Sequence, residues 1–353
     1  MSKNGEKSME AELQNLVQQK NKVVQSIEKL PGDASTRSYY RIKTNEQLMV
    51  AMSMEPFEEK GHLAPFLAIQ QHLHESGVDV PRVLDIDPKH GLILLEDLGD
   101  VTLLRRLLEV DSVESERKYF EKAVDALVHL HVYSGPSKVK TEQQKAAIEG
   151  FRLSFDREKL MWEVNFTMEH FFFKHLQRKI SDADQKVIQD EFTKICMELE
   201  QEPTVFTHRD YHSRNIMLTS STTGAGADER FVMIDFQDAR MGPPQYDLAS
   251  LLRDSYYQLD EKQISSLVEY YLRRMKEEGA EIKDVAKFNR LFDLMAVQRN
   301  FKAIGSFASF LNRRGNPAYL KFIGNTFENI RRNLRKYPEF KKLREVLYYH
   351  YYF

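Results

Sequence analysis

A cluster of polar side chains stands past the middle of the chain, where residues 207–219 read THRDYHSRNIMLT. A little further on, Asp235 closes the apolar run FVMID. Asp, Asn and Ser favour turns, so the cluster could be only a turn between two strands. His208 and His212 lie four positions apart, which also suggests zinc, but the helical zinc motif needs Glu directly after the first His and Arg209 stands there. The zinc interpretation is therefore the weaker of the two.

A third interpretation is phosphoryl transfer, which needs a carboxylate to orient the attacking hydroxyl and oxygen ligands to hold Mg²⁺. In protein kinases these groups are spaced H-R-D-x-x-x-x-N and are followed by an Asp after an apolar strand. The spacing from Asp210 to Asn215 matches without a gap, and Asp235 is the later carboxylate. The stretches NIML and RFVMID are expected to pair as a hairpin that brings Asn215 and Asp235 to the same end. The sequence thus predicts three oxygen ligands at one point.

The elements that must position this cluster begin with a small sheet. Residues 9–29 suit an amphipathic helix, and residues 32–54 predict a loop followed by a β-hairpin. Residues 61–76 are again typical of a helix, and the segments 80–84 and 91–95 indicate two short strands joined by the turn DPKHG. Together they predict a small sheet with a helix on it.

The pattern changes after residue 99. Residues 102–200 are almost entirely compatible with helices, and helical patterns return after Pro243-Pro244 and continue to the end. We therefore predict an α+β fold of two lobes, a small mixed β/α lobe over residues 1–96 and a large helical lobe over residues 97–353, with a hinge near residues 96–99.

Composition bounds the partners. A formal charge of −2 gives no overall attraction to nucleic acid or to an anionic membrane, and no apolar run reaches the roughly 18 residues of a spanning helix. Cys196 is the single cysteine, and the polar N-terminus lacks the features of a secretory signal, so we expect a cytoplasmic location. The basic and aromatic C-terminus is expected to be a helix packed on the lobe. We expect no nucleic-acid or membrane partner and infer no obligate protein partner.

The motifs resemble the aminoglycoside phosphotransferase-like branch of the kinase superfamily. In that branch the run D-x-x-x-A-x-x-G-P-x-x-Y-D-L-A, here within IDFQDARMGPPQYDLASLL, replaces the later motifs of protein kinases. Four further segments resemble the bacterial anomeric N-acetylmuramate/N-acetylglucosamine kinases, namely residues 32–42, 80–100, 160–172 and 297–320. The resemblance implies a protein-kinase-like fold and ATP-dependent phosphorylation of the C1 hydroxyl of amino sugars in cell-wall recycling.

The resemblance also implies residue roles. It makes Asp210 the catalytic base and Asn215 and Asp235 the Mg²⁺ ligands, with ATP as the phosphoryl donor. The segments involved would be the catalytic loop at 207–219, a metal-binding segment at 231–250 and substrate-closing helices at 287–330. The hinge would offer backbone groups to adenine through Glu96, Asp97 and Leu98, while His208 and Asp247 would brace the catalytic loop.

One departure from the kinase pattern concerns the phosphates. Protein kinases carry a Lys in V-A-I-K, whereas residues 50–53 here read VAMS. Our hypothesis is that Arg37 supplies the missing cation, with Ser35 and Thr36 as hydroxyl or backbone donors, because an Arg fork suits phosphate. The alternative is a surface Arg in a turn.

The sequence indicates less clearly which residues contact the molecule that accepts the phosphate. Glu163 and Glu169 lie six positions apart, which is not one helical face, so we expect at most one of them to face a sugar. Trp162 could stack on a pyranose or pack in the core. Arg299 could contact a lactyl carboxylate or form a structural pair with an Asp. The candidates for substrate contact are His212, Asp238, Glu163, Arg299 and Asn300.

Two other functions remain open at this point. One is a kinase for another hydroxyl acceptor, such as an aminoglycoside, choline or homoserine. The other is a nucleotide-binding pseudokinase, which the missing Lys favours and the intact Asp210, Asn215 and Asp235 oppose.

Overall fold

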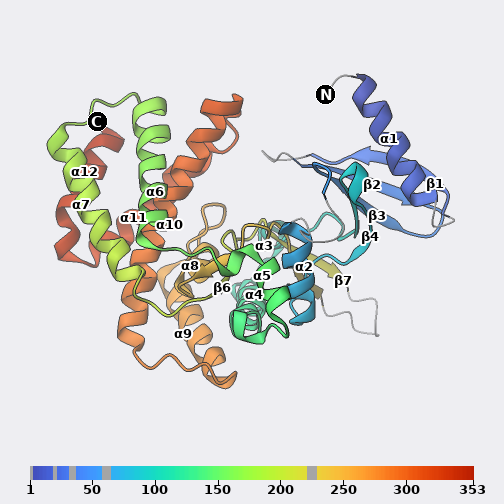
Figure 1. The fold of residues 1–353 in the computed structure, drawn as a ribbon. Helices are drawn as coiled ribbons and strands as arrows, with labels where there is room; N and C mark the ends of the chain where they lie inside the picture. The colour runs from blue at the N-terminus through green and yellow to red at the C-terminus, as the bar shows by residue number, and fades with distance from the viewer. Residues whose placement is uncertain (1–2, 19–21, 32–36, 58–64, 221–228) are drawn as a thin grey trace.

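A computed structural model describes residues 3–18, 22–31, 37–57, 65–220 and 229–353. It has a small sheet-containing lobe with α1 on it and a large, mainly helical lobe (Figure 1). The small lobe holds one antiparallel sheet of five strands in the order β1-β2-β3-β5-β4. Its elements are α1 (Lys3–Gln18), β1 (Val24–Lys29), β2 (Ser38–Thr44), β3 (Leu48–Ser53), α2 (Pro65–Glu75), β4 (Val83–Asp87) and β5 (Leu92–Glu96).

The prediction of one helix over residues 9–29 is wrong in its second half. The helix ends at Gln18, and β1 pairs antiparallel with β2, with Ile27 opposite Ile42. The register shifts between Val24 and Ser26, so the strict alternation that marks a strand is interrupted there. The strand was hidden in the sequence because a bulge breaks its period of two.

The large lobe is built mostly from helices. These are α3 (Leu103–Glu109), α4 (Val113–Tyr133), α5 (Glu142–Ala147), α6 (Arg157–Thr167), the π-helix η4 (Met168–His175), α7 (Asp182–Leu199), α8 (Gln245–Leu252), α9 (Glu261–Glu277), α10 (Val285–Arg314), α11 (Ile323–Arg335) and α12 (Lys341–Tyr352). Two two-stranded ladders lie among them, β6 (Val205–Thr207) with β9 (Arg240–Gly242) and β7 (Ile216–Ser220) with β8 (Glu229–Met233). Short 3₁₀ turns occur at Pro88–His90, Pro136–Lys138, Glu149–Phe151, Leu320–Phe322 and Pro338–Phe340.

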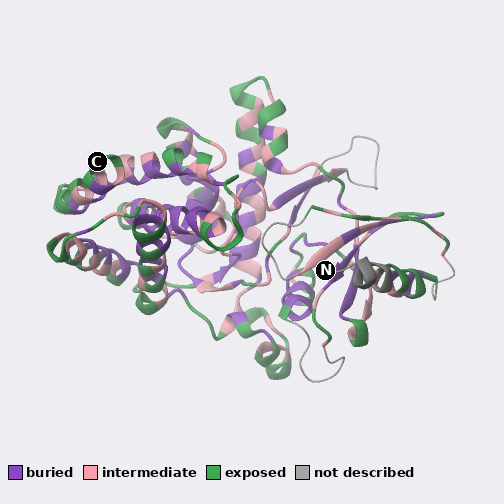
Figure 2. Ribbon diagram, turned by 90° about the horizontal axis from the view of Figure 1, so that it is seen from above, coloured by how far each residue is buried: buried purple, intermediate pink, exposed green. Residues whose placement is uncertain are grey.

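The main hydrophobic core runs through the large lobe and includes α2 (Figure 2). Phe66 of α2 stacks on Phe236 with ring centroids 5.0 Å apart, so this helix packs against the segment that follows Asp235. A second cluster lies under α1, where Leu13, Leu16 and Val17 cover one face of the sheet. Within the described ranges, no helix combines the length and apolarity that crossing a bilayer requires.

The junction between the lobes is held by ion pairs. Arg41 of β2 donates to both carboxylate oxygens of Asp97, at 2.6 and 3.0 Å. Glu96 at the end of β5 accepts from Arg82 at 2.9 Å and from Arg230 of β8 at 3.4 Å. Gly99 follows with φ +75°, a left-handed conformation that favours glycine. The side chains of Glu96 and Asp97 therefore stabilise the hinge, and contact with adenine through its backbone remains a prediction.

Candidate active site

The catalytic loop is the connection between β6 and β7. The ladder of β7 with β8 pairs Ile216 with Met233, and Ile234 N–H donates to the carbonyl of Asn215 at 3.0 Å. The predicted hairpin is confirmed, and Asn215 and Asp235 flank the same end of it. Asp235 has φ +66°, a strained conformation for a residue with a side chain, of the kind that concentrates at functional sites.

A pocket of about 660 Å³ adjoins this hairpin end. Asp210, Asn215 and Asp235 all line it. A cavity of this size is in the range that holds small-molecule ligands. The three oxygen-bearing side chains predicted from spacing therefore share one pocket.

Two cationic side chains of helix α10 face the carboxylate of Asp210. Lys302 Nζ is 3.1 Å from Asp210 Oδ1, and Arg299 Nη2 is 3.5 Å from the same oxygen. Burial by itself would raise the pKa of Asp210, but the positive charges of Lys302, Arg209 and Arg299 outweigh it and hold that pKa well below its usual range. Asp210 is therefore a carboxylate at neutral pH, as a proton acceptor must be.

Sequence reasoning missed Lys302. One signal was available: Lys302 lies three positions after Arg299, so in a helix both side chains project from one face. Once α10 places Arg299 beside Asp210, Lys302 follows on the next turn.

Asp247 holds the backbone of the catalytic loop. Its fully buried carboxylate accepts from the backbone N–H of His208 at 2.6 Å and of Arg209 at 2.9 Å. Arg209 has φ +80°, so these bonds offset the strain of a left-handed residue. His131 also lies 3.4 Å from the carboxylate. The His208 ring nitrogens are buried and have no hydrogen-bond partner in the described part of the chain, so this ring contributes by packing, with Tyr211 at 5.7 Å.

The donor set near Asp235 suits a hard cation. Asn215 Nδ2 donates to the carbonyl of Asp210 at 3.0 Å, which orients the amide and makes its oxygen the atom to offer a metal. Burial raises the pKa of Asp235; the hydrogen bond that Gln237 Nε2 donates at 2.6 Å opposes the rise, and the charge of Asp210 adds to it. A cation would relieve this crowding of carboxylates. Among the described residues no group of three or more His, Cys, Asp or Glu could by itself hold a metal ion.

Of the residues predicted to contact the acceptor, His212, Asp238 and Arg299 line the pocket, and Glu163 and Asn300 are not among its lining. Glu163 is buried and accepts from Gln298 Nε2 at 3.1 Å. Asn300 donates to the carbonyl of Ala296 at 2.8 Å. The Glu163 carboxylate is thus engaged in a contact between α6 and α10, and the Asn300 amide in a bond to the preceding turn of α10.

Two aromatic and acidic candidates on α6 and η4 also lie outside the pocket lining. Trp162 is 54% exposed and carries Lys159 over its ring at 3.9 Å, so it is neither a core residue nor part of the pocket. Glu169 pairs with Lys174 at 2.5 Å on the surface. Neither arrangement places these residues near Asp210.

On the nucleotide side, Ser35 and Thr36 lie outside the described residues. The guanidinium of Arg37 is 6.0 Å from the ring centroid of Phe66, which itself stacks on Phe236. Burial raises the pKa of Tyr39, the charge of Arg37 lowers it and the charge of Asp235 raises it. Arg37 and Asp235 are therefore both close enough to Tyr39 to act on its hydroxyl. Arg37 therefore lies on the side of the small lobe that faces the metal-binding segment, and its role stays a prediction.

Residues 26–282 match the family model described as "Phosphotransferase enzyme family". The chain belongs to this family. It is similar to the N-acetylmuramate/N-acetylglucosamine kinase of Neisseria meningitidis serogroup B, with 32% identity over 90% of this chain and 88% of that one. The protein of the same name in Pseudomonas aeruginosa is 31% identical over 90% of this chain and 86% of its own.

Solved structures agree on the fold. A choline kinase of Streptococcus pneumoniae superposes with a TM-score of 0.59 at 15% identity, covering 93% of this chain and 99% of that one. An ethanolamine kinase of Plasmodium vivax superposes with a TM-score of 0.58 at 14% identity, covering 86% of this chain and 81% of that one. The predicted two-lobed kinase-like fold is confirmed, and the protein is a phosphotransferase of the kinase type.

Proposed function

We propose that this kinase transfers the terminal phosphoryl group of ATP to the anomeric hydroxyl of N-acetylmuramate or N-acetylglucosamine. The observation that carries the proposal is the pocket that joins Asp210 to Asn215 and Asp235, in a chain 28–32% identical to kinases named for these sugars. The anomeric position is the one that the sequence resemblance implies.

The nucleotide would lie between the hinge and the hairpin end. Asn215 and Asp235 would hold Mg²⁺, which when bound neutralises phosphate charge. Arg37 would supply the cation that VAMS at residues 50–53 lacks, and residues 96–98 would offer backbone groups to adenine. The use of ATP, together with the single buried Cys196, fits a cytoplasmic enzyme.

Asp210 would act as the general base. Its carboxylate would orient the sugar hydroxyl and accept its proton as the new P–O bond forms. The bond between the terminal phosphoryl group and the ADP leaving group breaks in the same step. A base whose pKa is held low by Lys302 and Arg299 is a weak proton acceptor. An anomeric hydroxyl suits it because the ring oxygen makes that hydroxyl more acidic than an ordinary alcohol. Lys302 also places a positive charge beside the site where negative charge is transferred.

The residues that line the pocket suit a sugar better than a polycation as the phosphate acceptor. Aromatic rings suited to the apolar face of a pyranose line one part of it, from Tyr256, Phe307, Phe310 and Tyr319. Its charged lining holds five Arg or Lys residues, Arg209, Arg214, Arg253, Arg299 and Lys302, against four Asp residues, Asp210, Asp235, Asp238 and Asp254. An aminoglycoside would meet an excess of positive charge there.

The test is ADP release with ATP and Mg²⁺ across N-acetylmuramate, N-acetylglucosamine, an aminoglycoside, choline and homoserine, with ³¹P NMR of the product. We expect turnover with the N-acetyl sugars and a phosphate on C1. Turnover only with the other alcohols, or nucleotide binding without turnover, would contradict the proposal. Asp210→Asn is expected to lower kcat by about 10²- to 10⁴-fold while ATP still binds, because a general base contributes that much.

A further inference from the structure

His212 lies two residues after the proposed base and lines the same pocket. Its backbone N–H donates to the carbonyl of Asp210 at 3.1 Å, so a tight turn keeps the two residues together. The Nδ1 atom of the His212 ring is buried and has no hydrogen-bond partner in the described part of the chain. Because Nδ1 is enclosed by protein, a ligand in the pocket would meet the ring through Nε2. His212 therefore offers the pocket one polar nitrogen close to Asp210.

The imidazole of His212 is uncharged. Burial is the main cause that lowers the pKa of His212 to about 3; the charge of Asp210 opposes the shift, and the charges of Arg299 and Arg214 add to it. A neutral imidazole has one N–H and one lone pair, so it can donate or accept a hydrogen bond without carrying charge. A carboxylate binds best to a charged donor, so this ring suits a neutral amide or hydroxyl of the ligand.

Apolar side chains lie next to this ring. Tyr256 packs edge-on against His212 with ring centroids 5.2 Å apart, and Phe307 of α10 packs edge-on against Tyr256 at 5.9 Å. Ala303 lies four positions before Phe307, so both side chains are on one face of α10, and both line the pocket. Tyr256, Ala303 and Phe307 together form an apolar niche beside the imidazole, and the niche has room for a small group because Ala303 contributes only a methyl.

The turn that carries Tyr256 is anchored to the catalytic loop. Asp254 Oδ2 accepts from the backbone N–H and the hydroxyl of Ser213 at 3.0 and 2.5 Å, and Asp254 Oδ1 accepts from Tyr256 N–H at 2.9 Å. Ser213 follows His212 directly, so these bonds fix the two rings relative to each other. Groups held in advance in this way bind a ligand at a lower cost in entropy.

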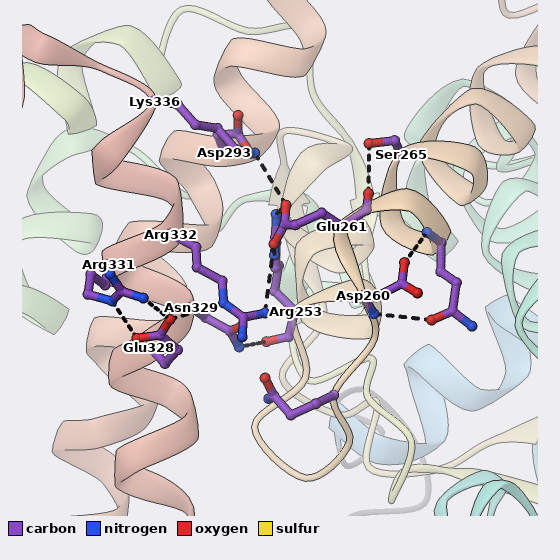
Figure 3. Close-up of polar contacts among 12 residues, drawn as sticks. Arg253, Asp260, Glu261, Ser265, Asp293, Glu328, Asn329, Arg331, Arg332 and Lys336 are labelled. Carbon is purple, nitrogen blue, oxygen red and sulfur yellow. Dashed lines mark hydrogen bonds and ion pairs between the residues drawn. The ribbon is translucent and has the colours of Figure 1, made fainter.

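Helices α9 and α11 hold the same turn from the other side. Arg253 pairs with Glu261 of α9 at 2.5 and 2.7 Å, and its carbonyl accepts from Asn329 of α11 at 3.3 Å (Figure 3). Lys336, directly after α11, lies 3.7 Å from Glu261 and 2.7 Å from Asp293 of α10. These contacts join three helices around the turn, so the apolar niche is already formed in the protein without a ligand.

We infer that His212 and the apolar niche bind the acetamido group on C2 of the sugar and so select N-acetylated sugars over glucose. The inference rests on the proposed function, which places the C1 hydroxyl at Asp210. The C2 substituent is the exocyclic group next to that hydroxyl, so it would lie beside the pocket groups that adjoin the base. His212 Nε2 would hydrogen-bond the amide, and the acetyl methyl would enter the niche. The other neighbour of C1 is the ring oxygen, which has no methyl group to place there.

The first test compares acceptors on the wild-type protein with ATP and Mg²⁺. We expect kcat/KM to be about 10- to 200-fold higher for N-acetylglucosamine than for glucose, the discrimination that one small apolar group in a pocket provides. N-butanoylglucosamine should be a poorer acceptor than N-acetylglucosamine, because the niche has room for a short acyl group only. Glucose as good an acceptor as N-acetylglucosamine would overturn the inference and leave the proposed kinase function standing.

Two substitutions of Ala303 should change the selectivity in opposite directions. Ala303→Leu fills the apolar niche and should lower the ratio of kcat/KM for N-acetylglucosamine to that for glucose about tenfold or more. Ala303→Gly enlarges the niche and should raise the ratio for N-butanoylglucosamine to N-acetylglucosamine several fold. A folding defect lowers activity with every acceptor together and cannot produce these opposite changes. A ratio that stays at the wild-type value in either variant would overturn the inference.

His212→Phe keeps a ring against Tyr256 and removes both ring nitrogens. It should lower the ratio for N-acetylglucosamine to glucose about 3- to 10-fold, the effect of one neutral hydrogen bond, and His212→Asn, which keeps a donor and an acceptor, should restore part of it. The matched control is His129→Phe, because His129 packs on Tyr133 at 4.6 Å outside the pocket lining and should keep the wild-type ratio. Equal losses with both acceptors in His212→Phe, or an unchanged ratio, would contradict the inference. If the wild-type protein phosphorylates neither N-acetyl sugar, the proposed function fails first.

Discussion

Replacing Lys302 by Met tests whether the cation beside Asp210 assists phosphoryl transfer. The two charges are 3.1 Å apart, and at an effective dielectric constant of ~20 their direct attraction is about 5 kcal/mol. Desolvation offsets much of this, and Arg299 at 3.5 Å remains to partner the carboxylate. A net loss of about 1.5–3 kcal/mol, typical of a hydrogen bond to a charged group, lowers kcat/KM by about 10- to 100-fold.

The same substitution should shift the pH dependence of kcat/KM in a defined direction. Lys302 is the largest of the influences that lower the pKa of Asp210, so its removal raises that pKa. The base then becomes protonated at a higher pH, and the acidic limb of the kcat/KM profile moves upward in the variant. Activity at mildly acidic pH should fall more than activity at alkaline pH.

The assay is coupled ADP release with N-acetylglucosamine over a pH series, with melting curves to verify folding. The matched control is Lys287→Met in the same helix, because Lys287 pairs with Glu202 on the surface and does not line the pocket. A Lys302→Met protein that melts normally and keeps both the wild-type kcat/KM and the wild-type acidic limb would refute the assigned role.

Two further predictions concern the loop brace and the phosphates. Asp247→Ala leaves the N–H groups of His208 and Arg209 buried without their acceptor, so we expect the free energy of unfolding to fall by about 2–4 kcal/mol and kcat to fall with it. Urea denaturation measures the free energy of unfolding, and Asp247→Asn should restore part of the stability that Asp247→Ala loses. An Asp247→Ala protein as stable and active as wild type would contradict the proposed role of Asp247 in holding the loop. Arg37→Ala should raise the KM for ATP about tenfold or more and leave the KM for the sugar nearly unchanged, because a charged contact to phosphate is lost. Unchanged KM for ATP and unchanged kcat in steady-state kinetics would show that Arg37 is only a surface arginine.

The order of chemical groups along the chain was enough to find the centre of the site. Asp210 and Asn215 belong to one short loop, and Asp235 follows the partner strand, so a local hairpin brings them together whatever the rest of the fold does. The two-lobed architecture was also readable, because strand patterns cluster before residue 96 and helical patterns after it. Local pattern failed at Val24–Lys29, where a bulge in an edge strand imitates the continuation of a helix.

Only the tertiary structure assigned the surroundings of that centre. Lys302 reaches Asp210 across 92 positions, and Arg214 is held by tyrosines that follow two different helices. Such contacts depend on how α8 and α10 pack over the catalytic loop, and short-range spacing carries no information about that packing. The order of the candidate reactive groups is thus encoded locally, whereas the charged and aromatic side chains around them are positioned by long-range burial of helix faces.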